Sequence, residues 1–201
     1  MKNRLCLFPE FGLEVTASTL LLGLDKFAGY DRLITGTQMN EWLLENMEKG
    51  TSRCISEEIS IRLLAYDDDL SMATKILERC AVAEPSGDAD ERLKWTAILL
   101  YEELSVLAQN AAPTSIFDLN SFWATLEWPP YSHKLLCDAE RYTIGRNGLK
   151  YSRSEHFSQS SCNAIITCHW DWLEQTVKDL GGLLPAGLRT QMEEEGHQGK
   201  R

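Results

Sequence analysis

Apolar side chains recur at helical spacing along most of this chain, and residues that cap or end helices lie between the apolar runs. Within residues 38–49, Trp42, Leu43 and Met47 form one face, as in an amphipathic helix. Thr37 precedes this run as a capping residue, and Gly50 follows it as a stop. The pattern therefore predicts a helix here.

Two shorter helices are expected next. Ser56 can cap the first, and Glu57 and Glu58 then lie favourably at its positive end. Asp69 can cap the second, which carries its apolar residues on one side. Short helices in close succession indicate helical hairpins that stack against one another.

The longest helices are expected in the middle of the chain and toward its end. Residues 85–88 read Pro-Ser-Gly-Asp, a sequence that breaks any helix. Asp88 followed by Glu91 then has the form of an acidic capping box and leads into a long apolar pattern. A last helix is expected over about residues 161–180, where Gly181 ends it.

Together these elements predict an all-α protein of stacked helical hairpins. Gly145, Asn147 and Gly148 give the strongest turn signal in the chain and allow a small β-hairpin near Gly145. The length suits one or two domains. We expect a single helical domain over residues 1–201, with a frayed tail from about residue 191.

Charge and composition narrow the function classes. The 201 residues include 30 Asp and Glu against 20 Lys and Arg, a net charge of −10. A generally basic surface that would bind nucleic acid or anionic lipid is therefore excluded. No apolar run is long enough for a transmembrane helix, and Pro9 and Glu10 interrupt any leader. Because the six scattered cysteines are expected to be reduced thiols, we expect a cytoplasmic protein.

Three helical runs and one aromatic block resemble a known family. The runs are Leu-Ile-Thr-Gly-Thr-Gln-Met-Asn-Glu-Trp-Leu-Leu at 33–44, Glu-Ile-Ser-Ile-Arg-Leu-Leu at 58–64 and Lys-Trp-Thr-Ala-Ile-Leu-Leu at 94–100, and the block at 122–131 includes Trp-Pro-Pro-Tyr. Over about residues 15–143 the chain resembles a bacterial helical family of unknown function. The resemblance implies an all-helical bacterial protein of the kind found among immunity proteins encoded beside toxin genes, and it brings no catalytic residues.

The acidic side chains are the feature best suited to function, because opposite charge speeds association with a basic partner. The candidate contacts are Asp67, Asp68, Asp69, Glu102 and Glu103. The same residues could equally be ordinary solvated positions that cap helices and keep the chain soluble. Both interpretations stay open.

An aromatic cluster offers a second kind of contact. Trp128 and Tyr131 could anchor a partner, since Trp and Tyr are enriched at binding hot spots. Their spacing suits a core equally well, together with Phe122 and Trp123. We include Trp128 and Tyr131 in the predicted partner-binding set.

The nearest approach to a reactive centre is formed by Cys162, Cys168 and His169. Structural zinc normally uses close ligand pairs such as Cys-x2-Cys, which are missing here. Residues 67–78 imitate a calcium loop, but Met72 stands where that loop needs glycine. Nucleophile–histidine–acid and phosphate-cradling motifs are also missing. We therefore predict no catalytic residues, no metal site and no cofactor.

These features favour an acidic cytoplasmic protein that neutralises a cognate, basic protein toxin by binding it directly. Two alternatives stay open. One is a metal-binding protein or enzyme that uses Cys162, Cys168 and His169. The other is a helical scaffold or homo-oligomer.

Overall fold

The fold is all-α, as the sequence predicts. The computed structural model describes residues 3–49, 55–66, 69–84, 87–109, 115–132, 144–145, 148–149 and 159–185. Within these ranges nearly all regular structure is helical. The chain divides into two compact units, each of which is described by itself.

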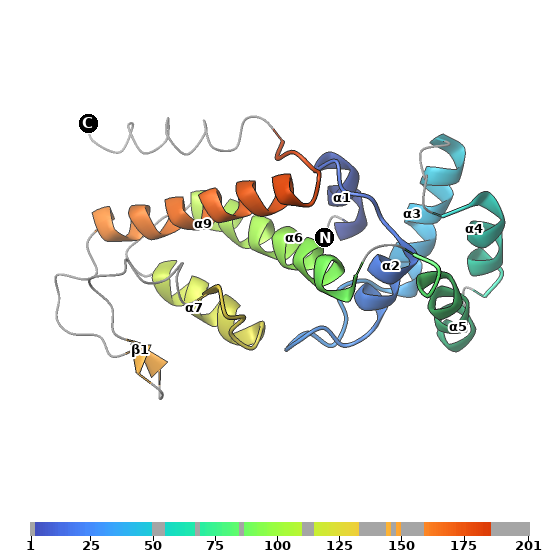
Figure 1. The fold of residues 1–201 in the computed structure, drawn as a ribbon, viewed down its shortest axis with the longest axis horizontal. Coiled ribbons are helices and arrows are strands. Elements are labelled where there is room, and N and C mark those ends of the chain that lie inside the picture. The colour runs from blue at the N-terminus through green and yellow to red at the C-terminus, as the bar shows by residue number, and fades with distance from the viewer. Residues whose placement is uncertain are drawn as a thin grey trace. The chain divides into compact units, whose positions relative to one another are not determined.

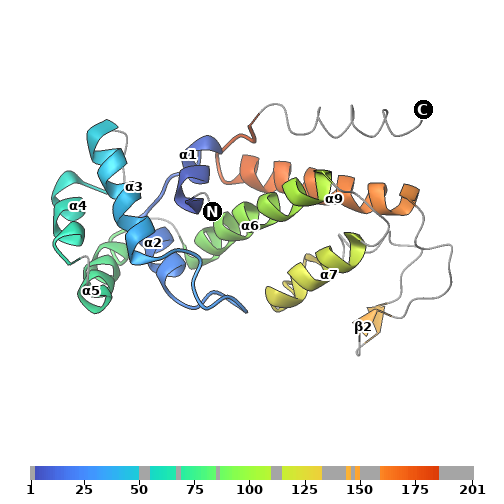
Figure 2. The same ribbon diagram turned by 180° about the vertical axis from the view of Figure 1, so that it is seen from behind.

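The first unit consists of Met1–Ile98 and Val177–Leu184. Its elements are the 3-10 helix η1 (Arg4–Cys6), α1 (Leu7–Glu10), α2 (Ala17–Leu24), α3 (Gly36–Lys49), α4 (Glu57–Leu64), α5 (Leu70–Ala81) and the first half of α6 (Asp88–Gln109). Helices α3, α4 and α5 pack against one another in chain order, and α5 also packs on α2 (Figures 1 and 2). This is the arrangement that successive helical hairpins produce.

The second unit consists of Leu99–Thr176 and Pro185–Arg201. Within it, the remainder of α6, α7 (Ser115–Thr125) and most of α9 (Gln159–Asp179) run side by side (Figures 1 and 2). Strand β1 (Ile144–Gly145) pairs antiparallel with β2 (Gly148–Leu149). This short pair lies at the turn where the sequence allows a hairpin.

Capping side chains fix the starts of three helices in the first unit. Ser56 and Asp69 accept hydrogen bonds from amides in the first turns of α4 and α5, as predicted. For α3 the predicted cap, Thr37, is wrong. The Gln38 amide donates to the Thr35 hydroxyl, and the Thr35 amide donates to the Gln38 side chain. This reciprocal pair starts the helix at Gly36, before the predicted position.

Helices α2 and α6 approach each other closely in the core of the first unit. Trp95 on α6 is fully buried, and its Nε1–H donates to the carbonyl of Thr19 on α2 over 2.9 Å. A Cβ atom built on Gly23 would lie 2.6 Å from the Trp95 ring, so glycine alone leaves room for the indole. The edge of Phe8 packs on the same ring, with centroids 4.9 Å apart.

A carboxylate from outside the helix covers the N-terminus of α2. Glu84 accepts hydrogen bonds from the Ala17 amide at 2.6 Å, the Ser18 amide at 3.0 Å and the Ser18 hydroxyl at 2.7 Å. Thr16 and Thr19 complete a capping box at the same end. Glu84, a residue far along the chain, thus accepts hydrogen bonds from amides that have no partner within the helix. A negative group is favourable at this position because the N-terminus of a helix is its positive end.

No helix in the described ranges combines the length and the apolar character that a membrane crossing requires. The single-domain expectation over residues 1–201 stays a prediction. The predicted frayed tail from about residue 191 lies outside the described residues.

Candidate partner-binding surface

The described part of the second unit carries acidic side chains and no lysine or arginine. Its six acids are Glu102, Glu103, Asp118, Glu127, Asp171 and Glu174. All six are exposed or half-buried, and they come from α6, α7, the turn after α7, and α9. These six carboxylates therefore contribute negative charge at the surface of the described part of this unit.

Two of these acids influence each other. Glu103 on α6 is half-buried, and its pKa is raised first by this burial and then by the neighbouring carboxylate of Asp118 on α7. Both effects disfavour the charged form of Glu103. A cation brought to this place by a partner would have the opposite effect, because it would stabilise both carboxylates.

A neutral hydrogen-bonded pair lies at the centre of the unit. Trp123 on α7 and His169 on α9 are fully buried, and the Trp123 Nε1–H donates to His169 Nε2 over 2.9 Å. The histidine proton is then on Nδ1, which donates to the Ile165 carbonyl over 2.7 Å. Burial lowers the pKa of His169 to about 4, although the bond to Ile165 acts in the other direction. The imidazole is therefore a neutral packing residue at ordinary pH.

Two aromatic rings lie against this pair and reach the surface. Tyr131 stacks on Trp172 of α9, with ring centroids 4.9 Å apart and planes inclined by 20°. Trp123 meets both rings edge-on, at 5.8 Å and 6.0 Å. Tyr131 and Trp172 are each half-buried, in contrast to the fully buried Trp123. The result is a supported aromatic pair on the rim of the core.

The turn that carries Tyr131 has an uncommon backbone. Glu127 and Trp128 have φ values of 59° and 53°, in the left-handed region that favours glycine. The Trp128 amide donates to the Trp123 carbonyl over 2.9 Å, which closes α7. Pro129 and Pro130 follow and prevent the helix from continuing. This strained ending directs the chain from α7 to Tyr131 and holds Trp128 half-buried.

Four residues of the predicted partner-binding set belong to the same unit. Glu102, Glu103, Trp128 and Tyr131 all lie in the second unit, where the acids and the aromatic pair are found. Asp69 lies in the first unit, and its exposed carboxylate caps α5. The hydrogen bond from the Ser71 side chain is the largest of several influences that lower the pKa of Asp69. Asp67 and Asp68 lie outside the described residues.

Trp172 is the member of the aromatic pair that sequence reasoning missed. Trp172 falls within the helix expected over about residues 161–180, but the sequence pattern gives it no place in the predicted partner-binding set. Trp170 is buried and packs edge-on against Tyr101, whereas Trp172, two residues later, points from a different side of the helix. The polar neighbours Asp171 and Glu174 were the available signal that this side of α9 meets solvent.

The alternative centre at Cys162, Cys168 and His169 lies on α9, and the three side chains differ in their exposure. Cys162 is buried, which raises the pKa of its thiol, whereas Cys168 is exposed. His169 uses both ring nitrogens in the hydrogen bonds to Trp123 and Ile165. In the described part of the chain no three His, Cys, Asp or Glu residues are grouped so that they could hold a metal ion. His156 lies outside that part.

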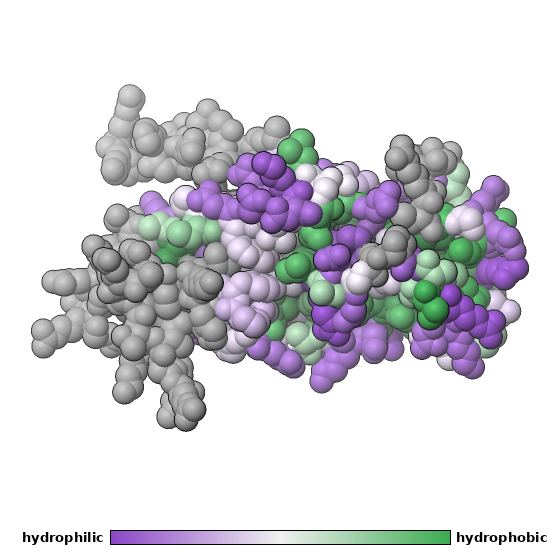
Figure 3. Space-filling view, viewed as in Figure 1, coloured by the Kyte–Doolittle hydropathy of each residue, from purple (hydrophilic) through white to green (hydrophobic). Residues whose placement is uncertain are grey.

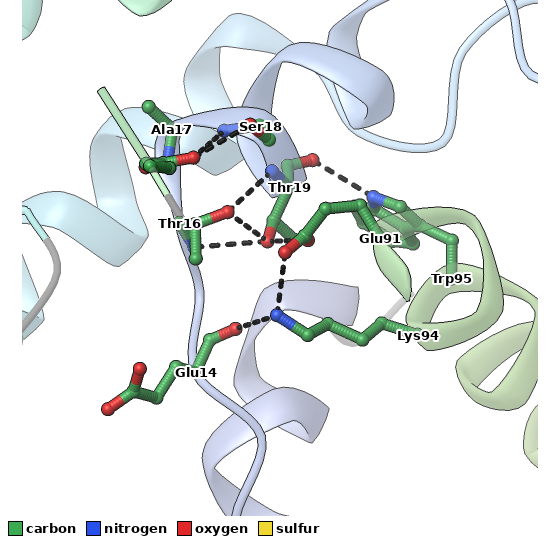
Figure 4. A network of polar contacts seen from close by, with 9 residues as sticks. Glu14, Thr16, Ala17, Ser18, Thr19, Glu91, Lys94 and Trp95 are labelled. Atoms are coloured by element: carbon green, nitrogen blue, oxygen red, sulfur yellow. Dashed lines mark hydrogen bonds and ion pairs between the residues drawn. The ribbon is translucent and has the colours of Figure 1, made fainter. Parts of the chain in front are cut away.

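In the first unit, the buried side chains of Glu91 and Lys94 carry opposite charges and belong to one network of hydrogen bonds (Figure 4). Glu91 accepts hydrogen bonds from the Thr19 hydroxyl at 2.5 Å and from Lys94 Nζ at 2.7 Å. Lys94 also donates to the Glu14 carbonyl over 3.3 Å. Glu91 is thus a core residue and not the capping-box partner of Asp88 that the sequence suggests. Its partners make it a structural group, with both carboxylate oxygens engaged.

Hydrophobic residues on the face shown in Figure 3 occur as separate patches among hydrophilic ones. Single exposed apolar side chains are normal for a folded protein and need no partner. Comparisons with protein-family models, with curated proteins and with solved structures find no match to this chain. The arguments for function therefore come from the residues themselves.

Proposed function

We propose that this protein binds a positively charged protein and neutralises it by covering the surface through which that protein acts. The observation that carries the proposal is the group of six exposed or half-buried acids in the described part of the second unit, together with the aromatic pair of Tyr131 and Trp172 that packs beside its core. The resemblance to helical immunity proteins makes a toxin the expected partner.

The two kinds of side chain suit different steps of binding. Surface carboxylates attract a basic partner and raise the association rate, an effect that salt weakens. Half-buried Trp and Tyr side chains supply contact area at little entropic cost, which slows dissociation. Glu102 and Glu103 contribute to the first step, and Trp128 and Tyr131 to the second.

The direct test is coexpression with the protein encoded beside this chain's gene. The expected result is rescue of growth from that protein's toxicity and recovery of a complex with a tagged copy of this chain. The complex should form more slowly as salt is added. Rescue without a complex, or neither, contradicts the proposal. A self-associated chain without a heterologous complex would favour the scaffold alternative.

Charge variants locate the surface. Replacing Glu102, Asp171 and Glu174 by Gln, Asn and Gln should lower the association rate about tenfold at low salt, with a smaller effect on dissociation. The matched control replaces three exposed acids of the first unit, Glu41, Glu45 and Glu57, by Gln. Both sets change the net charge equally. An equal fall of the association rate in both variants would show that the rate depends on the net charge of the chain and not on the acids of the second unit.

The acidic triplet has its own test. Asp67, Asp68 and Asp69 belong to the predicted set and can be replaced together by Asn, a residue that also caps helices. Loss of binding in this variant, with the second-unit variant unaffected, would move the surface to the start of α5. The opposite result supports the second unit.

A further inference from the structure

The hydrogen bond between Trp123 and His169 can form only while the histidine is neutral. The Trp123 indole can only donate, and it donates to His169 Nε2 over 2.9 Å. In a protonated imidazole both ring nitrogens carry a proton, so two donors would face each other. Turning the ring over does not help, because the other nitrogen is protonated as well. The bond is therefore lost when His169 gains a proton.

The second hydrogen bond of His169 survives this change but does not hold the two helices together. Nδ1 donates to the carbonyl of Ile165, which lies one turn earlier on α9 itself. Trp123 belongs to α7, so the bond to the indole is the one that crosses between the helices. Both side chains are fully buried, and a charge placed between them is costly in such surroundings. A proton on His169 therefore weakens the contact of α7 with α9 in particular.

The other titratable groups of the unit do not supply this response. On the described parts of α6, α7, the turn after α7 and α9 they are Tyr101, Glu102, Glu103, Asp118, Glu127, Tyr131, Cys162, Cys168, Asp171 and Glu174. None of them is a cause of the pKa shift of His169, which comes from burial and from the Ile165 bond. Glu103 responds to acid in the opposite sense, because a proton there removes its repulsion with Asp118 on α7.

We infer that the contact between Trp123 and His169 is a proton-sensitive switch, in which a proton on His169 separates α7 from α9 within the second unit. Trp123 also packs edge-on against Tyr131 and Trp172, so the turn after α7 loses this support when the indole leaves. That turn carries Trp128 and Tyr131 of the candidate surface. In this respect the inference rests on the proposed function, and acid should release a bound partner.

The positions of the histidines restrict the response to one unit. All four, His133, His156, His169 and His197, belong to the second unit. Histidine is the side chain whose ordinary pKa lies between pH 5 and pH 8. Mild acid therefore changes the charge of side chains in the second unit and leaves those of the first largely unchanged.

Hydrogen exchange of the full chain, followed amide by amide, tests the switch. Protection of the α7 amides, corrected for the intrinsic exchange rate, should fall about 25-fold from about pH 7.5 to about pH 5. This factor follows from a pKa of about 4 for His169 in the folded chain and 6.5 in the open form. Protection of the α2 amides in the first unit should stay nearly constant. Unchanged protection in α7, or an equal fall in α2, overturns the inference.

Two variants assign the response to His169. In His169→Gln the side chain can still accept the Trp123 hydrogen bond but does not titrate, so the fall in protection should disappear. The matched variant replaces His133, His156 and His197 by Gln and leaves His169 as the single histidine, so the fall should persist.

The outcomes of these variants are decisive. A fall that persists in folded His169→Gln, or that disappears in the triple variant, overturns the inference. The triple variant decides alone if His169→Gln does not fold. Because these measurements use the chain without a partner, failure of the switch leaves the proposed function standing. A switch without any coexpression complex would contradict the proposed function instead.

Discussion

The two units use buried polar groups in opposite ways. In the first, a carboxylate and an ammonium are buried together, with Glu91 and Lys94 joined over 2.7 Å. In the second, the central pair of Trp123 and His169 is neutral, and the charges of the described residues lie toward solvent. The difference separates charge that is paired inside a core from charge that faces solvent.

A buried ion pair and a neutral hydrogen bond differ in how much stability is lost when one partner is removed. Removing one member of a buried ion pair leaves an uncompensated charge in a medium of low polarity, which is among the largest penalties a single substitution can cause. A neutral hydrogen bond costs less when it is lost. The comparison between the units can therefore be tested by substitutions whose effects should rank in a definite order.

The largest effect is expected from Glu91→Ala. The variant leaves Lys94 buried without its carboxylate, so the free energy of unfolding should fall by about 3–5 kcal/mol. Urea unfolding followed by circular dichroism measures it. The control, Asp88→Ala, breaks the exposed pair with Arg92 and should cost less than about 0.5 kcal/mol. Similar losses in the two variants would show that the first unit does not depend on its buried charge.

Acid should weaken the second unit through His169. Its pKa is about 4 in the folded chain, against 6.5 for an ordinary histidine, so the unfolded chain binds the proton first as pH falls. Stability is then lost between about pH 6.5 and pH 4, by about 3 kcal/mol in total. The measurement is urea unfolding across this range. His169→Gln should remove this part of the pH dependence, and an unchanged slope in the variant would assign the loss to other groups.

A smaller effect is expected from Gly23→Ala. The new methyl group would meet the Trp95 ring, and relieving this overlap should cost about 1–3 kcal/mol. Thermal unfolding detects the change. Gly87→Ala is the matched control, because nothing lies within 4 Å of a Cβ atom there, and its effect should stay within about 0.5 kcal/mol. An equal loss of stability in the two variants would show that the close approach of α2 and α6 at Gly23 does not restrict the size of this residue.

The smallest effect is expected at the start of α2. Glu84→Ala removes the acceptor for three hydrogen bonds, and the loss should resemble that of a helix cap, about 1 kcal/mol. Chemical denaturation measures the difference. Glu78→Ala, an exposed residue of α5, controls for the change in charge. If the two variants are equally stable, Glu84 does not contribute to holding α2.

Local signals were sufficient for most of the fold. Ser56 and Asp69 cap their helices as predicted, because a cap depends on a few consecutive residues. The end of α9 at Gly181, with φ of 83°, follows from the same kind of signal. Thr37 shows the limit of this reasoning, since Thr35 offered an equally good cap two residues earlier and has the reciprocal partner Gln38.

Long-range partners could not be predicted in the same way. Glu91 looks like a capping residue until Thr19 on another helix is placed beside it, 72 residues away in the sequence. The stacking of Tyr131 on Trp172 likewise joins the turn after α7 to α9. Periodicity shows that a side chain faces a core but not which side chain it meets there. The prediction from sequence therefore covers Glu102, Glu103, Trp128 and Tyr131 of the candidate surface, but neither its other four acids nor Trp172.

The end of α9 has a consequence for how the chain matures. Val177–Leu184 belongs to the first unit, and the Leu183 amide donates to the Phe11 carbonyl over 2.7 Å. Val177–Leu184 follows Leu99–Thr176 in the chain. The ribosome therefore makes residues 1–98 well before the segment that completes their unit. Until then the first unit lacks Val177, which is fully buried in the folded chain, and an incomplete unit is open to chaperones and proteases. A stalled or shortened translation product should consequently be degraded instead of accumulating as a stable fragment.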